Sequence, residues 1–337
     1  AGASFVLLGP AQTSLSSRSK VVAVTATRTG TGKSPLTQWL ARSLVDEGVK
    51  VVTIRHPMPY GNLRAQAVQR FASTADLDTQ DCTIEEREEY SPYVSQGLVI
   101  FAGVDYEAIV RAAEAEADLI LWDGGNNDFS FVSADLNIVV CDALRAGHGL
   151  DYYPGETNFR AADIVVINKV GAAAAEDIQT IRSLKDAINP SAGLVTADLD
   201  VTVEDPERLL GKRVLIVEDG PTVTHGGMGY GAGWVAAHKY GVGEVLDPRN
   251  SAVGSLLDTF NAYPQLLAVL PAMGYSQRQR QELKASIEGS GADLVLNASP
   301  ADVGRVLELG LPVVQVKYRF APQSGDDLLA SVRTLLA

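Results

Sequence analysis

The feature that most constrains the fold is a glycine-rich loop placed between an apolar strand and a helix. Residues 21–25 are an apolar run that predicts a buried strand. A helix is predicted to begin near Pro35, to carry Leu36, Leu40 and Leu44 on one side, and to end at Gly48. The loop between them reads Thr27-Arg28-Thr29-Gly30-Thr31-Gly32-Lys33-Ser34. This order of strand, glycine loop and helix predicts a phosphate-binding P-loop.

The chemistry of a P-loop assigns a role to each part of this segment. Backbone N–H groups surround a β-phosphate, Lys33 neutralises charge, and Ser34 binds Mg²⁺. The predicted nucleotide-binding residues are Thr29, Gly30, Thr31, Gly32, Lys33 and Ser34. Thr27 stands where the usual pattern has its first glycine, which is tolerated if its φ is negative. The alternative is a plain turn at the start of a helix.

An aspartate directly after another predicted strand supports the same site. Residues 119–122 predict a buried strand, and Asp123 follows it directly. We expect Asp123 to hold Mg²⁺ together with Ser34, and the backbone of Gly124 and Gly125 to approach the γ-phosphate. The polar residues Asn126 and Asn127, which come next, suit a catalytic loop and are predicted to bind substrate. The alternative for Asp123 is a residue that only caps a turn.

Alternating strands and helices continue to the end of the chain and define the fold class. They predict an α/β protein with a P-loop NTPase domain of mainly parallel sheet, followed by a second Rossmann-like α/β domain. We place the P-loop domain at residues 21–211 and the second domain at residues 212–337. Residues 1–10 form a predicted strand that is either the last strand of a preceding domain, joined by a Ser-rich linker up to residue 20, or an edge strand of the main sheet.

A nucleobase loop is predicted after the strand at residues 164–167. Asn168 and Lys169 match the first half of the Asn-Lys-x-Asp pattern of GTP-binding proteins and are expected to pack against a purine. Gly171 replaces the aspartate that accepts hydrogen bonds from guanine. We therefore predict ATP as the nucleotide, with GTP as the alternative.

Cationic side chains in other strand-end loops are candidate substrate and catalytic residues. Open α/β sheets bind ligands at the carboxyl ends of their strands, and phosphoryl oxygens suit the arginine fork. The catalytic candidates are Lys33, Asp123, Arg28, Arg55 and His56, and the further substrate candidates are Arg64, Arg145, His148, Thr224, His225 and Arg249. The glycine-rich stretch at 218–233 is expected to cradle an anion, or else to form a lid or hairpin. The acidic run at 85–89 is expected to be a solvated helix face rather than a carboxylate cluster.

Charge and composition exclude several classes of protein. The 337 residues carry a net charge of −13, so the surface at large should repel nucleic acid and anionic membranes. Cys82 and Cys141 are the only cysteines and lack the spacing of a disulfide framework or a structural zinc site. These features favour a cytoplasmic enzyme without a nucleic-acid or membrane partner. A homodimer is one candidate assembly.

These motifs together resemble the cyclic 2,3-diphosphoglycerate synthetase family, whose members are also described as predicted GTPases. The residues that carry the resemblance lie at 29–34, 55–61, 122–128, 153–156, 218–221 and 224–228. The resemblance implies an ATP- and Mg²⁺-dependent ligase that closes 2,3-diphosphoglycerate into its cyclic anhydride by γ-phosphoryl transfer, with a small phosphorylated acid as substrate. The alternatives are a P-loop GTPase or ATPase of the nucleotide-switch or metallochaperone type and a nucleotide-binding scaffold without turnover.

Overall fold

The computed structural model describes residues 2–6, 8–58, 61–124, 128–274 and 276–337. The chain divides into two compact units. The first unit contains Ala1–Arg70, Leu98–Asp198 and Ala321–Ala337, and the second contains Phe71–Gly97 and Leu199–Phe320. This division differs from the expected 21–211 and 212–337.

Two contacts explain the difference. Ile84, from residues 71–97, is part of the buried apolar core of the second unit. Arg333, near the end of the chain, forms an ion pair with Glu47 of the first unit at 2.6 Å. Each unit therefore includes a segment that lies far from its main part in the sequence.

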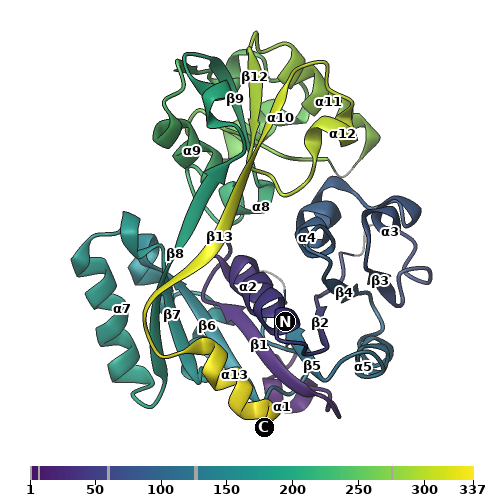
Figure 1. Cartoon of the computed structure of the whole chain (residues 1–337), viewed down its shortest axis with the longest axis vertical. Coiled ribbons are helices and arrows are strands. Elements are labelled where there is room, and N and C mark those ends of the chain that lie inside the picture. Colours follow the sequence, from purple (N-terminus) through teal and green to yellow (C-terminus); the bar gives the residue numbers. More distant parts are fainter. Residues whose placement is uncertain (1, 7, 59–60, 125–127, 275) are drawn as a thin grey trace. The chain divides into compact units, whose positions relative to one another are not determined.

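A mainly parallel sheet forms the centre of the first unit (Figure 1). Its strands lie in the order β8-β7-β6-β1-β5-β2-β4-β3. Their bounds are β1 Lys20–Ala26, β2 Val51–Ile54, β3 Gln69–Phe71, β4 Val99–Ala102, β5 Leu119–Trp122, β6 Leu136–Asp142, β7 Ile164–Asn168 and β8 Gly193–Val203. The apolar runs at residues 21–25, 119–122 and 164–167 predicted β1, β5 and β7.

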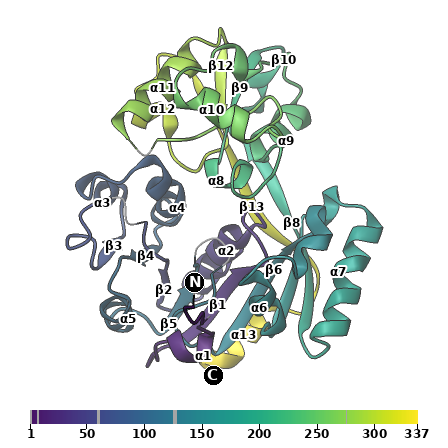
Figure 2. The ribbon, with the colours of Figure 1, turned by 180° about the vertical axis from the view of Figure 1, so that it is seen from behind.

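Helices cover both faces of this sheet. α2 and α13 lie on one face and α6 on the other, as the front and back views show (Figure 1, Figure 2). The helices of the first unit are α1 Pro10–Thr13, α2 Lys33–Asp46, α5 Tyr106–Glu114, α6 Gly155–Arg160, α7 Ala175–Ile188 and α13 Leu328–Leu336, with 3₁₀ turns η1 Ala143–Gly149 and η2 Val170–Ala172. The predicted helix from near Pro35 to Gly48 corresponds to α2.

Strand register decides which residues meet at the carboxyl edge of the sheet. β1 pairs in parallel with β5, Ala23 opposite Trp122, and β2 pairs with β5, Ile54 opposite Trp122. β6 pairs in parallel with β7, Asp142 opposite Asn168. Asp123, Arg55, Asp142 and Asn168 are therefore brought to the same edge as the loop that follows β1.

The N-terminal segment departs from the expected strand. The described residues among 2–9 form no strand, and Phe5 and Leu8 are 85% and 57% exposed. α1 begins at Pro10 instead. The alternative of an edge strand of the main sheet is therefore wrong for the described residues, because these side chains have no apolar layer to cover them.

The second unit is a smaller α/β arrangement. Its strands lie in the order β10-β9-β12-β13, and β11 also pairs with β9. The strands are β9 Arg213–Glu218, β10 Glu244–Val245, β11 Leu270–Pro271, β12 Leu294–Asn297 and β13 Val313–Gly325. The helices are α3 Thr74–Thr79, α4 Ile84–Val94, α8 Gly220–Val223, α9 Ala232–Tyr240, α10 Ser255–Ala262, α11 Gln277–Glu288 and α12 Val303–Leu307, with 3₁₀ turns η3 Pro206–Leu209 and η4 Pro248–Asn250.

The acidic run at 85–89 lies in α4 and is not a solvated face. Glu85, Glu86 and Glu88 are only 2%, 3% and 5% exposed. Glu86 forms a capping box with Thr83, in which each side chain binds the other residue's backbone N–H. The expectation of a solvated face is wrong because Ile84 of α4 lies in the apolar core of the second unit and Glu88 accepts a hydrogen bond from Ser299 Oγ at 2.6 Å.

In the part of the chain that the structure describes, no helix is both long and apolar enough to span a membrane.

Candidate nucleotide and substrate site

The phosphate loop joins the carboxyl end of β1 to the start of α2. Gly30 and Gly32 have φ angles of 77° and 97°, which residues with a side chain rarely adopt. Thr27 does not have a positive φ, so a residue with a side chain is tolerated where the usual P-loop pattern has its first glycine. Within the described residues Gly32 caps α2 without a side chain, and the first N–H groups of a helix are the ones that bind anions.

Asp123 is the centre of the charged groups beside this loop. It is fully buried, and its Oδ1 accepts hydrogen bonds from Lys33 Nζ at 2.5 Å and Ser34 Oγ at 3.3 Å. Its Oδ2 accepts from Arg55 Nη1 at 2.9 Å. Arg55 also donates to Ser34 Oγ at 3.1 Å. The structure thus brings together Lys33, Ser34, Arg55 and Asp123, which the sequence had placed in one site.

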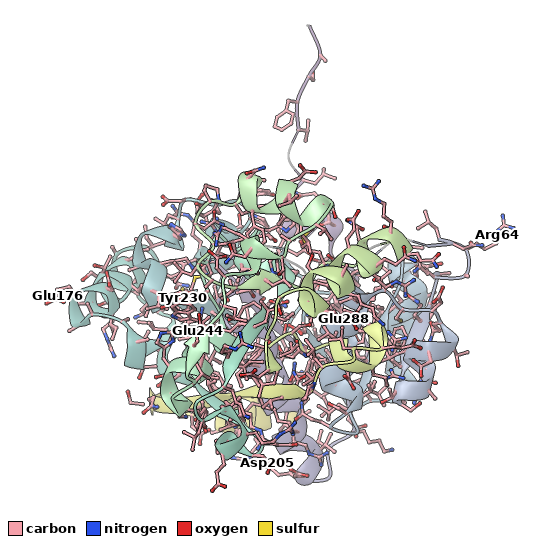
Figure 3. The ribbon with its side chains drawn as sticks, turned by 90° about the horizontal axis from the view of Figure 1, so that it is seen from above. Arg64, Glu176, Asp205, Tyr230, Glu244 and Glu288 are labelled. Carbon is pink, nitrogen blue, oxygen red and sulfur yellow. The ribbon has the colours of Figure 1, made fainter. Side chains whose placement is uncertain are left out.

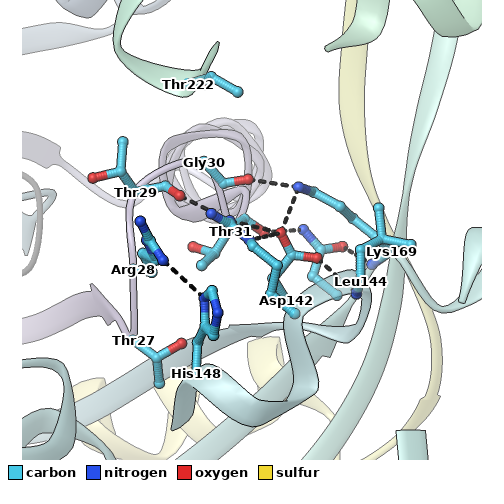
Figure 4. A network of polar contacts seen from close by, with 12 residues as sticks. Thr27, Arg28, Thr29, Gly30, Thr31, Asp142, Leu144, His148, Lys169 and Thr222 are labelled. Atoms are coloured by element: carbon cyan, nitrogen blue, oxygen red, sulfur yellow. Dashed lines mark hydrogen bonds and ion pairs between the residues drawn. The ribbon is translucent and has the colours of Figure 1, made fainter. Parts of the chain in front are cut away.

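Three consecutive carbonyls of the phosphate loop accept hydrogen bonds from side chains at the carboxyl end of β7 and just beyond β6 and β7 (Figure 4). The pairs are Arg145 Nη2 with Thr29 O at 2.8 Å, Lys169 Nζ with Gly30 O at 2.6 Å, and Asn168 Nδ2 with Thr31 O at 2.8 Å. We call Arg145, Asn168 and Lys169 the carbonyl clamp. Because the clamp holds these three carbonyl oxygens, it fixes the orientation of the loop's peptide planes.

Asp142 neutralises the two cations of the clamp. Its Oδ2 accepts from Arg145 Nη2 at 2.7 Å and from Lys169 Nζ at 2.8 Å. Burial lowers the pKa of Lys169, and the charge of Asp142 opposes that shift. Arg145 was expected to bind substrate, and Lys169 with Asn168 to contact the purine. The structure instead shows all three bound to the phosphate loop, and these substrate and nucleobase roles stay predictions.

Asp142 was not selected from the sequence, although a signal existed. It is the last residue of the buried strand β6, and Asp123 directly follows the buried strand β5. The two aspartates differ in what they hold. Asp123 binds the lysine and serine of the loop itself, whereas Asp142 binds the side chains that orient the loop.

Arg28 lies on the loop between two aromatic side chains. Its Nη1 donates to Tyr152 Oη at 2.6 Å and lies 3.0 Å from His148 Nδ1, and its guanidinium stacks over the Tyr152 ring. Burial, followed by the charges of Arg28 and Arg145, lowers the pKa of His148. A neutral imidazole accepts the Arg28 hydrogen bond at Nδ1. Arg28 and His148 are thus brought together, as expected for one site.

The loop after β2 contributes one further pair. His56 Nδ1 lies 2.8 Å from Asp128 Oδ2, and Asn158 Nδ2 donates to the backbone oxygen of Asp128 at 2.7 Å. Arg64 is exposed, and its side chain extends outward from the chain (Figure 3). Gly125, Asn126 and Asn127 lie outside the described residues, so their predicted roles stay predictions.

The candidates of the second unit serve local structure. Thr224 Oγ1 donates to Gly220 O at 2.8 Å and lies 3.2 Å from His225 Nδ1. Arg249 pairs with Asp247 at 3.1 Å, donates to two backbone oxygens and stacks on Phe260. Their substrate-binding roles stay predictions.

The glycine-rich stretch binds an anion that the chain supplies itself. Glu218 is 1% exposed and accepts backbone hydrogen bonds from Gly231, Gly233 and Trp234 at 3.0, 3.2 and 2.9 Å. A Cβ at Gly231 would lie 2.5 Å from the Glu218 carboxylate. Burial raises the pKa of Glu218 to about 7, against these hydrogen bonds. Three backbone N–H groups of this stretch thus bind the Glu218 side chain, and binding of an external anion by the stretch stays a prediction.

The carboxylate of Asp198 lies beside Gly171, the residue that replaces the aspartate of the Asn-Lys-x-Asp pattern. Gly171 N donates to Asp198 Oδ2 at 2.9 Å, and a Cβ at Gly171 would lie 2.1 Å from that oxygen. Asp198 comes from β8, which the sequence did not predict. Asp198 of β8 thus supplies a carboxylate next to the position where the pattern has its aspartate.

The geometry fits a Mg²⁺–nucleotide. Ser34 Oγ and the Asp123 carboxylate are neighbouring oxygen donors, which Mg²⁺ prefers, and this ion takes few protein ligands beside phosphates. The hydroxyl of Thr31 is buried in the loop without a hydrogen-bond partner in the described part of the chain. Fold and site together define a P-loop α/β protein. Among solved structures, LpxK from Aquifex aeolicus has the same fold, with a TM-score of 0.51, 15% identity, and coverage of 96% of this chain and 89% of that one.

Sequence comparison identifies the family. No family model matches the chain. It is 57% identical to arginine synthetase ArcE of Thermococcus kodakarensis over 318 residues, which are 94% of this chain and 71% of the relative. It is 28% identical to cyclic 2,3-diphosphoglycerate synthetase of Thermococcus sibiricus over 130 residues, 37% of this chain and 29% of that protein. The chain belongs to the cyclic 2,3-diphosphoglycerate synthetase-like family, in which ArcE is a member. The resemblance stated from the sequence is confirmed.

Proposed function

We propose that this protein is an ATP- and Mg²⁺-dependent synthetase that transfers the γ-phosphoryl group to an oxygen of a small substrate and so activates that substrate for displacement. The observation that supports this most is the set of contacts around Asp123. Lys33 and Ser34 of the phosphate loop and Arg55 of the next strand end all bind this one buried carboxylate. Phosphoryl transfer is accelerated mainly by positioning and charge neutralisation, which this arrangement supplies.

Each residue of the site has its own role in the proposed phosphoryl transfer. Lys33 and the first N–H groups of α2 would neutralise the phosphates, and Arg55 would position Asp123 and Ser34. Ser34 and Asp123 would hold Mg²⁺, which supplies charge neutralisation at the transferring group. The carbonyl clamp keeps the loop in its phosphate-binding conformation through Thr29, Gly30 and Thr31. We assign Arg28, which lies in the same loop, to the substrate.

We propose a ureido amino acid as substrate and arginine as product. The relative that matches 94% of the chain at 57% identity is named for arginine synthesis. A guanidine forms from a ureido group when a nitrogen nucleophile replaces the oxygen. The ureido oxygen attacks the γ-phosphorus and ADP leaves; ammonia then attacks the carbon, the carbon–oxygen bond breaks, and inorganic phosphate leaves. Phosphorylation by ATP thus converts the ureido oxygen, which is a poor leaving group, into a phosphate, which is a good one.

Cyclic 2,3-diphosphoglycerate formation is the second candidate. It is favoured by the resemblance to the synthetase of Thermococcus sibiricus, which extends over 37% of this chain. That substrate carries two phosphates and needs several free cations. Arg145, which was expected to serve it, is paired with Asp142, and so is the neighbouring cation Lys169. This pairing favours the ureido substrate over the diphosphate.

One experiment separates these candidates. The purified chain is incubated with ATP, Mg²⁺, ammonium and citrulline, the ureido counterpart of arginine, and in parallel with ATP, Mg²⁺ and 2,3-diphosphoglycerate. We expect arginine and ADP in equal amounts from the first mixture by chromatography, and no cyclic product from the second by phosphorus NMR. A cyclic product without arginine would establish the second candidate. ATP hydrolysis that no substrate stimulates would favour a nucleotide switch.

A further inference from the structure

The loop after β2 and the segment after β5 meet in a histidine–aspartate pair. His56 Nδ1 lies 2.8 Å from Asp128 Oδ2. A carboxylate oxygen accepts, so the imidazole donates from Nδ1, and the neutral ring then has its lone pair on Nε2. In the part of the chain that the structure describes, no hydrogen bond uses this Nε2. The pair thus presents an imidazole nitrogen that can accept a proton.

The aspartate of the pair is held in place by α6. Asn158 is 6% exposed, and its Nδ2 donates to the backbone oxygen of Asp128 at 2.7 Å. The same helix lies against the start of the phosphate loop, because a Cβ at Gly155 would lie 2.4 Å from Thr27 O. One helix therefore contacts both the phosphate loop and the aspartate that orients His56.

The pair borders the groups that would bind Mg²⁺ and phosphate. His56 directly follows Arg55, whose Nη1 lies 2.9 Å from Asp123 Oδ2 and 3.1 Å from the hydroxyl of Ser34. Asp128 belongs to the segment that begins at Asp123. Both members of the pair therefore come from strand ends that also supply the site for the transferring phosphoryl group.

His56 is open to small solutes, unlike the residues at the centre of the site. The side chains of His56 and Asp128 are 24% and 40% exposed, whereas those of Arg55 and Asp123 are 3% and 0% exposed. A small molecule from solvent can therefore reach the imidazole. The buried groups act on the phosphates, and the histidine is left for a second reactant.

The proposed reaction needs a base for its second reactant. Ammonia attacks the phosphorylated ureido carbon, yet near neutral pH dissolved ammonia is present almost entirely as ammonium, which has no lone pair. One proton has to leave before the carbon–nitrogen bond forms. Imidazole is the side chain that enzymes use most often for such a proton transfer, and an aspartate on its other nitrogen stabilises the imidazolium that results.

We propose that His56 is the general base that activates the nitrogen nucleophile and that Asp128 positions it. Nε2 takes one proton from ammonium, and the lone pair that is freed forms the bond to the phosphorylated carbon. The carbon–oxygen bond breaks, its electron pair leaves with inorganic phosphate, and a second proton passes from the new nitrogen to that phosphate. The imidazolium then releases its proton to solvent. This assignment rests on the proposed function.

A comparison of two nucleophiles tests the base. Initial rates of the full chain with ATP, Mg²⁺ and citrulline are measured with ammonium and with hydroxylamine, a much weaker base that is largely unprotonated near neutral pH. His56→Gln should lower the rate with ammonium by about 100-fold or more and the rate with hydroxylamine far less. Asp128→Asn, which keeps the size and removes the charge, should change the ratio of the two rates in the same direction. The matched control is His238→Gln, at an exposed histidine of α9, which should keep both parent rates.

Equal loss of the two rates in His56→Gln would show a structural role and overturn the proposal, as would an unchanged rate with ammonium. If neither variant folds, ¹⁵N NMR of the imidazole in the parent chain decides: a proton on Nδ1 with a bare Nε2 supports the base, and a neutral ring with its proton on Nε2 overturns it. A parent chain that forms no product from either nucleophile contradicts the proposed function and the base with it. A parent chain that makes arginine, with variants that lose both rates equally, contradicts the base alone.

Discussion

The ammonium group of Lys33 lies 2.5 Å from Asp123 Oδ1, and both side chains are buried. This pair joins the phosphate loop to the end of β5, the strand next to β1 in the sheet. Arg55 binds the other oxygen of the same carboxylate. The buried aspartate thus has two cationic partners, and a nucleotide phosphate that attracts Lys33 still leaves Asp123 paired with Arg55.

Lys33→Ala should abolish synthesis while leaving the chain folded. We expect turnover of ATP to fall by at least about 100-fold, because the loop loses the cation that neutralises the phosphates. The remaining partner Arg55 should limit the loss of stability to about 1–3 kcal/mol. Release of ADP and thermal unfolding measure the two effects. Lys50→Ala, at an exposed lysine of the same unit, is the control, and an active Lys33→Ala variant would contradict the assigned role.

Lys169→Met should weaken the binding of ATP and GTP to the same degree. Its ammonium binds Gly30 O and Asp142, so its removal loosens the phosphate loop rather than a nucleobase contact. We expect both dissociation constants to rise by about tenfold in a fluorescence titration with each nucleotide. A change in the ratio of the two constants would instead show that Lys169 contacts the base.

ATP should stabilise the chain more than GTP in a thermal-shift titration. Gly171 has no carboxylate for guanine, and the nearby Asp198 accepts the N–H of Gly171. Asp198→Asn keeps an acceptor for that N–H and should leave the preference for ATP unchanged. If GTP is preferred and the variant removes that preference, Asp198 supplies the guanine-reading carboxylate.

The unfolding free energy should fall as the pH rises from about 5 to about 8. Burial raises the pKa of Glu218 from 4.5 to about 7, so the folded chain binds this proton more tightly than the unfolded chain. The folded state therefore gains stability as the pH falls through 7, and gains no more below about 4.5, where both states are protonated. The effect is at most about 3 kcal/mol.

Glu218→Gln should flatten this dependence, as followed by chemical denaturation across the pH range. Glu88 shifts in the same direction, so a smaller slope should remain in the variant. A pH profile identical to that of the parent would show that Glu218 is ionised in the folded chain throughout.

The sequence predicted the parts of the fold that depend on residues close to one another in the chain. Continuous apolar runs predicted β1, β5 and β7. The glycine-rich stretch before a helix predicted a phosphate loop with Gly30, Gly32 and Lys33. β8 was missed because it is only partly buried and its sequence includes charged residues, Asp198 among them. Residues 1–10 were predicted to form a strand, yet the described residues among 2–9 form none and Phe5 is 85% exposed.

The ion-pair partners of the cations could not be predicted. Arg145 was predicted to bind phosphoryl groups and Lys169 to contact a purine, because the sequence does not show that Asp142 lies within hydrogen-bond distance of both. The acidic run of α4 looked solvated because the contact of Glu88 with Ser299 joins residues 211 positions apart. Charged side chains are placed by such long-range contacts, whereas strands and loops follow from neighbouring residues.

Oxygen transfer from substrate to phosphate tests the central claim most directly. Citrulline labelled with ¹⁸O in its ureido group is incubated with the chain, ATP, Mg²⁺ and ammonium, and the inorganic phosphate is examined by phosphorus NMR. If the γ-phosphoryl group is transferred to the ureido oxygen, every phosphate released with arginine contains one ¹⁸O atom. Unlabelled phosphate released with arginine would contradict phosphoryl transfer to the substrate.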